Sequence, residues 1–145
     1  MRFDQTKFLA DDVERLSRFY VDALDCETVV DPQEVDGAVS RAAGVPDATI
    51  ALSILRLPGR GDNGPVLELY SVSGPRSDGW SYRSGSGQIA FEVDDLETGI
   101  GRVIAAWGSQ LGEVVEWTAP SGAVARFVYL TDPEGNIIDL FVRVR

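Results

Sequence analysis

Residues 86–95 read SGQIAFEVDD, and residues 3–12 read FDQTKFLADD. Each stretch contains a glutamine, a short strand-like run and a pair of aspartates. A helix-like segment follows each stretch, DVERL in the first copy and DLETGI in the second. A phrase that recurs in this way indicates an internal repeat, so the two halves of the chain are expected to share one fold.

The match continues beyond this phrase when Gln5 is superposed on Gln88, a shift of 83 positions. Apolar residues in both helix-like segments follow the i, i+3, i+4, i+7 spacing of a helix with one apolar face. The first aspartate of each pair, Asp11 or Asp94, is the expected N-cap, because a glutamate follows three residues later in both copies.

Strand signals follow each helix. They are CETVV, ATIALSILRL and PVLELYSV in the first half, and EVVEW, VARFVYL and NIIDLFVRV in the second. The segment TDPEGN is assigned to turn formation, with Asp132 bonding local backbone amides. The chain is therefore predicted to be one α+β domain, made of a module over residues 1–72, a connection over 73–87 and a module over 88–145. Each module has the order strand, helix and three strands.

Alternation along the strands predicts which side chains face away from the helices. In QIAFEV the more apolar face is expected to meet the helix, which directs Gln88 to the other face, and the same parity directs Gln5 and Lys7 there. Glu68 and Asp139 occupy matching places in the closing strands, each flanked by apolar residues. One acid and one amide per module are thus expected to point away from the apolar layer.

The repeated unit, with GQIAFEVDDLE, LELY and YLTDPEGNIIDLF, resembles the vicinal oxygen chelate superfamily. This superfamily includes glyoxalase I, methylmalonyl-CoA epimerase, extradiol dioxygenases and the bleomycin-resistance proteins. The resemblance implies two tandem βαβββ modules whose mixed sheets enclose a partly open cavity, and a homodimer. It also implies metal ligands on the first and last strands of each module, at the positions of Gln5, Glu68, Gln88 and Asp139.

The chain departs from the metal-binding members of that superfamily. It contains no histidine, although the family often has one where Gln88 stands here, and Asp139 is one methylene shorter than the usual glutamate. If a metal binds, carboxylate and amide oxygens would suit Mg, Mn or Ca. The favoured expectation is a cavity without a cofactor, in which Gln5 and Gln88 form hydrogen bonds.

Glu68 and Asp139 are the candidate catalytic residues. Two acids that face one cavity repel each other and lose solvation, so one of them should keep its proton to a higher pH. Such a pair could move a proton next to a carbonyl. The alternative left open is that one or both acids bond to neighbouring side chains.

Gln5, Lys7, Gln88 and Trp80 are the candidate substrate-binding residues. Lys7 can pair with Glu68, neutralise a substrate carboxylate or extend into solvent, and the last of these is favoured. Trp80 lies in the connection between the modules. It can contact a flat ligand, or it can simply pack within the connection.

Composition excludes several classes of function. A formal net charge of -10 makes nucleic acid an unfavourable partner, and no apolar run is long enough to span a membrane. The N-terminus lacks the pattern of a signal peptide, so a cytoplasmic protein is expected. The single cysteine, Cys26, is expected to be a buried structural thiol.

Three functions remain open at this point. The first is a glyoxalase-like lyase or isomerase that acts on a small carbonyl compound. The second is a non-catalytic small-molecule binder of the antibiotic-resistance type, similar to the bleomycin-resistance proteins. The third is a regulatory or scaffold copy of the fold with an unused cavity.

Overall fold

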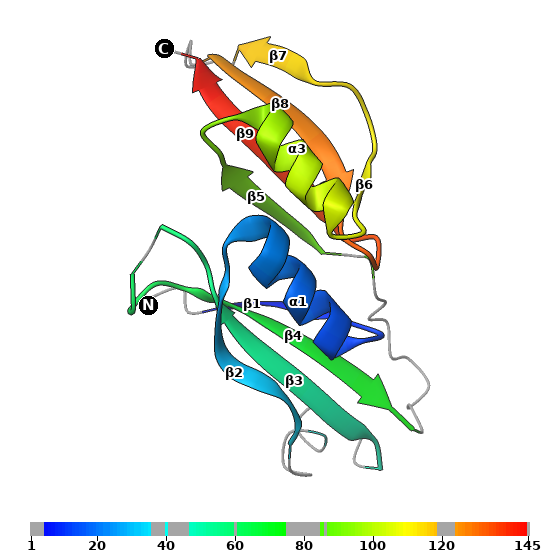
Figure 1. The fold of residues 1–145 in the computed structure, drawn as a ribbon. Coiled ribbons are helices and arrows are strands. Elements are labelled where there is room, and N and C mark those ends of the chain that lie inside the picture. Colours follow the sequence, from blue (N-terminus) through cyan, green and yellow to red (C-terminus); the bar gives the residue numbers. More distant parts are fainter. Residues whose placement is uncertain are drawn as a thin grey trace.

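The computed structural model describes residues 5–35, 40, 47–59, 61–74, 85, 87–118 and 124–144. Two modules follow each other along the chain (Figure 1). The first consists of β1 (Gln5–Leu9), α1 (Val13–Leu24), β2 (Glu27–Glu34), β3 (Thr49–Arg56) and β4 (Val66–Ser73). The second consists of β5 (Gln88–Glu92), α3 (Leu96–Ala105), β6 (Ser109–Gln110), β7 (Val115–Thr118), β8 (Val124–Thr131) and β9 (Ile137–Val144). The predicted α+β class and the repeated βαβββ order are confirmed, and the short strand β6 is an addition.

Each module folds its strands into one mixed sheet. The first sheet has the order β1-β4-β3-β2, and the second has the order β5-β9-β8-β6, with β7 also pairing with β8. β1 runs parallel to β4, and β5 runs parallel to β9, whereas the other pairs are antiparallel. The first strand of each module therefore lies beside the last strand of the same module, within this one chain.

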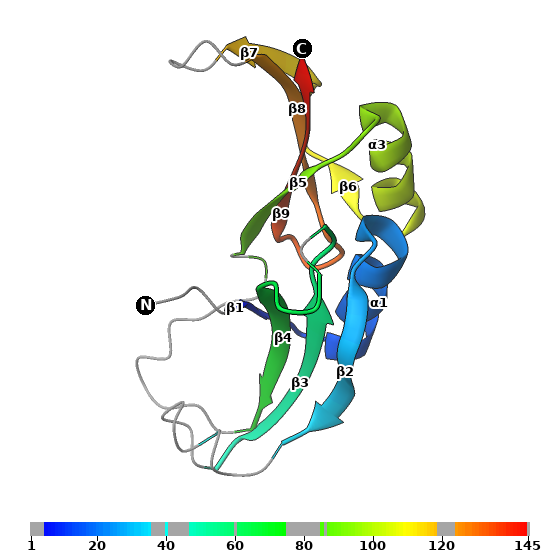
Figure 2. The same ribbon diagram turned by 90° about the vertical axis from the view of Figure 1, so that its left-hand side faces the viewer.

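Both helices lie on the same side of the two sheets (Figure 2). The N-caps are Asp12 and Asp95, whose side chains accept hydrogen bonds from the backbone N–H groups of Arg15 at 2.9 Å and Thr98 at 2.8 Å. The sequence-based choice of the first aspartate in each pair was thus wrong by one residue. The backbone stays extended through the second aspartate, so the following glutamates lie one place nearer the helix start than expected.

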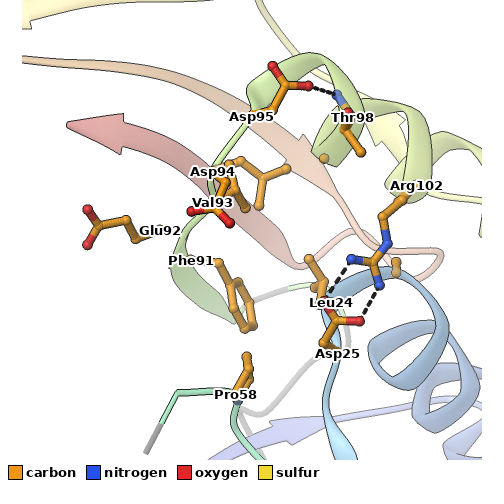
Figure 3. Close-up of a pocket in the computed structure, with 13 residues that line it drawn as sticks. Leu24, Asp25, Pro58, Phe91, Glu92, Val93, Asp94, Asp95, Thr98 and Arg102 are labelled. Atoms are coloured by element: carbon orange, nitrogen blue, oxygen red, sulfur yellow. Dashed lines mark hydrogen bonds and ion pairs between the residues drawn. The ribbon is translucent and has the colours of Figure 1, made fainter. Parts of the chain in front are cut away.

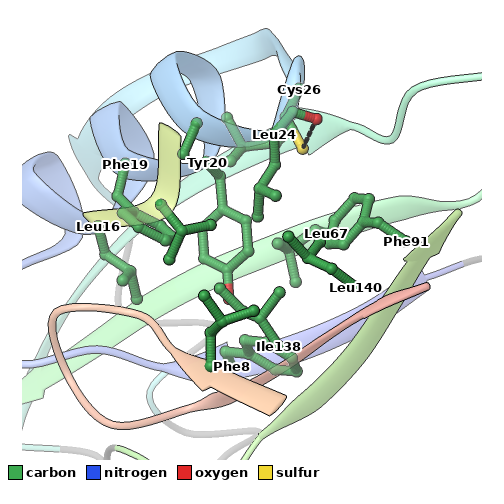
Figure 4. Close-up of a cluster of buried hydrophobic side chains, with 14 of the residues drawn as sticks. Phe8, Leu16, Phe19, Tyr20, Leu24, Cys26, Leu67, Phe91, Ile138 and Leu140 are labelled. Carbon is green, nitrogen blue, oxygen red and sulfur yellow. Dashed lines mark hydrogen bonds between the residues drawn. The ribbon is translucent and has the colours of Figure 1, made fainter. Parts of the chain in front are cut away.

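The two modules share one apolar core (Figure 4). Leu16 and Tyr20 of α1 lie in the same buried cluster as Leu67 of β4 and Leu140 of β9. Cys26 is buried at its edge, and this burial raises the pKa of the thiol to about 12, as expected of an unreactive structural cysteine. Among the described residues, no helix is long and apolar enough to cross a membrane.

A buried polar cluster also joins the modules. The Asp132 carboxylate, at the turn before β9, accepts hydrogen bonds from the backbone N–H groups of Glu134 and Asn136, from the Asn136 side chain at 2.6 Å, and from the Tyr20 hydroxyl at 3.1 Å. Burial and the nearby Asp132 charge raise the pKa of Tyr20 well above its ordinary value, so Tyr20 stays protonated as a donor. The expected local bonds of Asp132 are confirmed, but the turn also holds α1.

Glu134 makes a second connection from the same turn. Its carboxylate accepts the backbone N–H groups of Asp11 at 2.6 Å and Asp12 at 2.8 Å, which lie at the N-terminal end of α1. A negative charge there is favourable, because the helix dipole is positive at this end. TDPEGN therefore does more than form a turn, contrary to its assignment from the sequence.

Candidate functional site

The predicted site residues on the strands lie on the faces of the two sheets that point away from α1 and α3. In β5, Phe91 is buried towards the helices, whereas Gln88 and Glu92 are exposed on the other face. The two sheets form a crescent whose open side is opposite the helices (Figure 2). The predicted direction of these side chains is thus confirmed. This open side of the crescent, called the open face below, carries the candidate site.

The two modules place their acids at equivalent points with different neighbours. Lys7 of β1 lies directly opposite Glu68 of β4. In the second module, Ala90 occupies the place of Lys7 and lies opposite Asp139. Residues opposite each other on paired strands share a face of the sheet. Glu68 therefore lies next to the Lys7 cation, whereas Asp139 lies next to the methyl group of Ala90.

Glu68 is held by an ion pair. Its side chain is buried, and the Lys7 Nζ atom lies 2.7 Å from its Oε1 atom. The side chain of Lys7 remains about half exposed on the open face. Of the three alternatives for Lys7, the structure shows the pairing with Glu68, whereas extension into solvent was favoured from the sequence. A buried carboxylate needs a compensating charge, and β1 supplies it.

Asp139 lacks such a partner. Its Oδ1 atom is buried and forms no hydrogen bond within the described part of the chain. Burial raises the pKa of Asp139 above its ordinary value. The sequence predicted that one of the two acids would show a raised pKa, through mutual repulsion and loss of solvation. Loss of solvation is the cause of the shift observed at Asp139.

Aromatic rings surround Asp139 on the open face. Tyr129 of β8 lies directly opposite Asp139 and is 42% exposed. Phe127, two residues earlier, meets the Tyr129 ring edge to face with 5.5 Å between the ring centroids. Phe141 lies opposite Phe127 on β9. These three rings, called the aromatic strip below, offer an apolar surface beside one poorly solvated carboxylate.

The remaining predicted residues are placed as follows. Gln5 is half-buried on β1, and Gln88 is exposed on β5. Trp80 lies outside the described residues. Within the described part of the chain, no hydrogen bond or ion pair joins Glu68 to Asp139. The structure thus brings Lys7 and Glu68 together, and Asp139 stands with its own strand neighbours.

The predicted metal ligands fit a divalent ion poorly. The Lys7 ammonium already lies against Glu68 Oε1, where it would repel a metal cation. We therefore derive no chemical step through a metal.

A cavity of about 320 Å³ opens at the seam between the modules, on the helix side of the sheets (Figure 3). Three of its polar side chains already serve the fold. Arg102 of α3 binds Asp25, at the end of α1, with two hydrogen bonds of 2.6 and 2.8 Å, and Asp95 caps α3. The cavity contains none of the predicted site residues. Its geometry indicates a structural seam, and the candidate site remains the open face.

Comparison with known protein families agrees with this architecture. The model of the glyoxalase-like domain family matches residues 5–141. The chain belongs to the glyoxalase-like family. This membership confirms the resemblance to the vicinal oxygen chelate superfamily that the repeated motifs indicated.

Several solved structures share this glyoxalase-like fold. A glyoxalase family protein from Bacillus cereus is 17% identical, with a TM-score of 0.77 over 100% of this chain and 95% of that one. A glyoxalase-related enzyme from Fulvimarina pelagi is 18% identical, with a TM-score of 0.63 over 98% and 88% of the two chains. Glyoxalase I from Zea mays is 23% identical, with a TM-score of 0.60 over 96% of this chain and 46% of that one. No curated protein sequence matches the chain significantly.

Asp139 makes the stability of this glyoxalase-like protein depend on pH in a testable way. Because its pKa is raised in the folded state, the folded protein binds more protons than the unfolded chain between the two pKa values. The Asp139 contribution to the free energy of unfolding therefore falls as pH rises through that interval. We expect Asp139→Asn to be more stable than the wild type at pH 7.

This gain should disappear below the ordinary aspartate pKa of 3.8, where Asp139 is protonated in both states. Urea unfolding of the two proteins at several pH values measures the difference. A stability difference that stays constant across the pH range would show that Asp139 ionisation has no part in it.

Proposed function

We propose that this glyoxalase-like protein is a small-molecule enzyme, a lyase or isomerase, in which Asp139 moves a proton next to a substrate carbonyl. The observation that supports the proposal is the buried, unpartnered Asp139 Oδ1 atom on the open face. A structural carboxylate normally has its oxygens satisfied, so an unsatisfied one is a candidate for substrate contact.

In the proposed reaction, the Asp139 carboxylate removes the proton from the carbon next to the carbonyl group. The electron pair of that C–H bond moves to form an enolate, whose negative charge rests on the carbonyl oxygen. Asp139 then returns the proton to a neighbouring atom in an isomerase, or a leaving group departs with the electron pair in a lyase. The raised pKa of Asp139 makes it a stronger base than an ordinary aspartate.

The other open-face residues take supporting roles in this proposal. Lys7 supplies a positive charge for an anionic oxygen of the substrate, and Glu68 fixes Lys7 through their ion pair. Gln5 and Gln88 donate hydrogen bonds to polar substrate atoms. The aromatic strip covers the apolar side of the molecule. A homodimer and a cytoplasmic location remain predictions.

Proton transfer can be tested before the substrate is known. A panel of small hydroxy-ketones, keto acids and related carbonyl compounds is incubated with the protein in D₂O, and proton NMR detects deuterium entering the carbon next to the carbonyl. Asp139→Asn should slow this exchange at least about a hundredfold, the usual contribution of a general base. Asp62→Asn is the matched control, because the Asp62 side chain is 91% exposed. Exchange at the wild-type rate in a folded Asp139→Asn protein would refute the proposal.

The aromatic strip also favours a second candidate, a non-catalytic binder of a flat small molecule. Rings on an exposed sheet face bind planar ligands without any proton transfer. The same experiment separates the two functions. If the protein is a binder, the NMR signals of one compound should shift on addition of the protein, but no deuterium should enter that compound beyond its rate in buffer. Asp139→Asn should then leave this rate of deuterium uptake unchanged.

A further inference from the structure

A second hollow lies on the helix side, away from the open face. It is a groove of about 430 Å³ between α1 and the C-terminal end of α3, two helices that lie side by side (Figure 1). Arg15, Arg18 and Phe19 line it from α1, and Arg102 and Trp107 line it from the other side. The volume is within the range of small-molecule pockets. Three arginines and two aromatic rings line this groove together with Asp22, although the chain as a whole is strongly acidic, and Arg18 is paired with Glu14 of its own helix.

Trp107 occupies a backbone position at the end of α3 that is unfavourable for a residue with a large side chain. The backbone N–H groups of Trp107 and Gly108 bond to the carbonyl groups of Ile104 and Val103, which is the standard double closure of a helix C-terminus. The residue at the place of Trp107 has a left-handed backbone, here with φ 73°, and is usually glycine. The tryptophan side chain is 84% exposed, so burial within the chain does not offset this cost.

The glycine of the Trp107–Gly108 pair serves another purpose. A Cβ atom at Gly108 would lie 2.5 Å from the Thr131 carbonyl oxygen and 2.6 Å from the Val103 side chain. Gly108 is thus required for close packing against β8. Trp107 therefore occupies the left-handed position. No contact within the described part of the chain explains why this residue has a large aromatic side chain.

Arg15 is an available cation beside this ring. Its side chain is 55% exposed, and its guanidinium forms an ion pair with the buried Glu134 carboxylate at 3.7 Å. That distance is too long for a hydrogen bond, and among the described residues the guanidinium donates none. Arg102, in contrast, is held by two hydrogen bonds to Asp25. The Arg15 guanidinium therefore keeps N–H donors that a planar anion can accept, and this anion would share the positive charge of Arg15 with Glu134.

From this geometry we propose that the groove binds a small aromatic anion, a flat ring that bears one carboxylate or similar group. The Arg15 guanidinium holds the anionic group with two parallel hydrogen bonds. The ring lies along the exposed indole of Trp107, over the buried ring of Phe19. In this proposal, the exposed Trp107 ring binds the ligand, and the unfavourable helix end is its cost.

Isothermal titration of the full chain with 2-naphthoate tests the site, with neutral 2-naphthamide of the same shape as the control ligand. We expect saturable binding of the naphthoate and at least tenfold weaker binding of the amide. Arg15→Gln should weaken naphthoate binding about tenfold or more, since it removes a charge-assisted hydrogen-bonded pair. Arg126→Gln, an exposed arginine outside the groove, should leave the affinity unchanged.

Trp107→Gly gives the most specific result. It should abolish naphthoate binding and at the same time raise the melting temperature, because glycine adopts the left-handed backbone without strain. A loss of binding by unfolding would lower the melting temperature instead. Absence of naphthoate binding to the wild type, equal binding of the amide, unchanged affinity in Trp107→Gly, or an equal loss in Arg126→Gln would each overturn the proposal.

Discussion

Asp132→Ala should lower the free energy of unfolding by about 3 to 5 kcal/mol. Its carboxylate accepts four hydrogen bonds, from the Tyr20 hydroxyl, the Asn136 side chain and the backbone N–H groups of Glu134 and Asn136. Asp132 and Asn136 are both almost completely buried. Alanine would therefore leave several buried donors without an acceptor, and each such donor carries the full cost of its lost solvation.

Urea unfolding followed by circular dichroism measures this loss. Tyr20→Phe removes only the hydroxyl donor, so we expect it to cost about 1 kcal/mol. Asp62→Ala, at an exposed aspartate, should stay within about 0.5 kcal/mol of the wild type. An Asp132→Ala protein that loses less than about 1 kcal/mol would show that water replaces the carboxylate in the cluster.

The cluster around Asp132 also determines where the candidate site residues stand. The Asn136 side chain accepts a hydrogen bond from the Gly87 N–H at 2.9 Å, and Gly87 immediately precedes Gln88. Asp139 follows Asn136 by three residues on β9. The start of β5 is thus bonded to Asn136, which precedes β9. Asn136 is bonded to Asp132, and Asp132 accepts the hydrogen bond from Tyr20 of α1. A local turn motif thereby aligns the second module's site strands with the first module's helix.

Features set by local chemistry could be predicted from the sequence. The phrase around Gln5 and Gln88 revealed the repeat, and alternation showed which side chains face away from the helices. Both follow from the two-residue period of a strand and the 3.6-residue period of a helix. β6 was missed because Ser109 and Gln110 are too few to show any period.

Features set by contacts between distant segments could not be predicted. Lys7 and Glu68 are 61 positions apart, and only the register of β1 on β4 brings them together. The bonds from Asp132 to Tyr20 and from Glu134 to the start of α1 span more than 100 positions. Turn propensity accounts for a segment such as TDPEGN by itself and contains no information on its distant partners.

The environment of Asp139 illustrates the same limit at the candidate site. Its place in the repeat identified Asp139 as a candidate catalytic residue. The alternation of side chains along the strand predicted that it faces away from the helices. The missing hydrogen-bond partner depends on Ala90 standing across from it where the first module has Lys7. Once the strand register is known, this difference distinguishes the two acids. From the sequence alone, the two acids had the same predicted role.

Leu140→Ala should lower the free energy of unfolding by about 3 kcal/mol and destabilise both modules together. Leu140 of β9 is completely buried, and a Cβ atom on Gly99 of α3 would lie only 3.0 Å from it, so the helix packs closely on this side chain. Alanine would leave a cavity in the cluster that residues of the first module complete, among them Leu16 and Leu67. Each module therefore buries apolar side chains against the other in this cluster.

A single transition in urea, with the same midpoint by tyrosine and tryptophan fluorescence and by circular dichroism, is the expected result for wild type and Leu140→Ala alike. Leu69→Ala, at an equally buried position of the first module, should produce a loss of similar size and shape. Leu111→Ala is the exposed control and should change stability little. If Leu140→Ala instead split unfolding into two steps, the first module would be able to fold without the second. The shared core would then be a contact between two domains, and the open face would depend on how those domains dock.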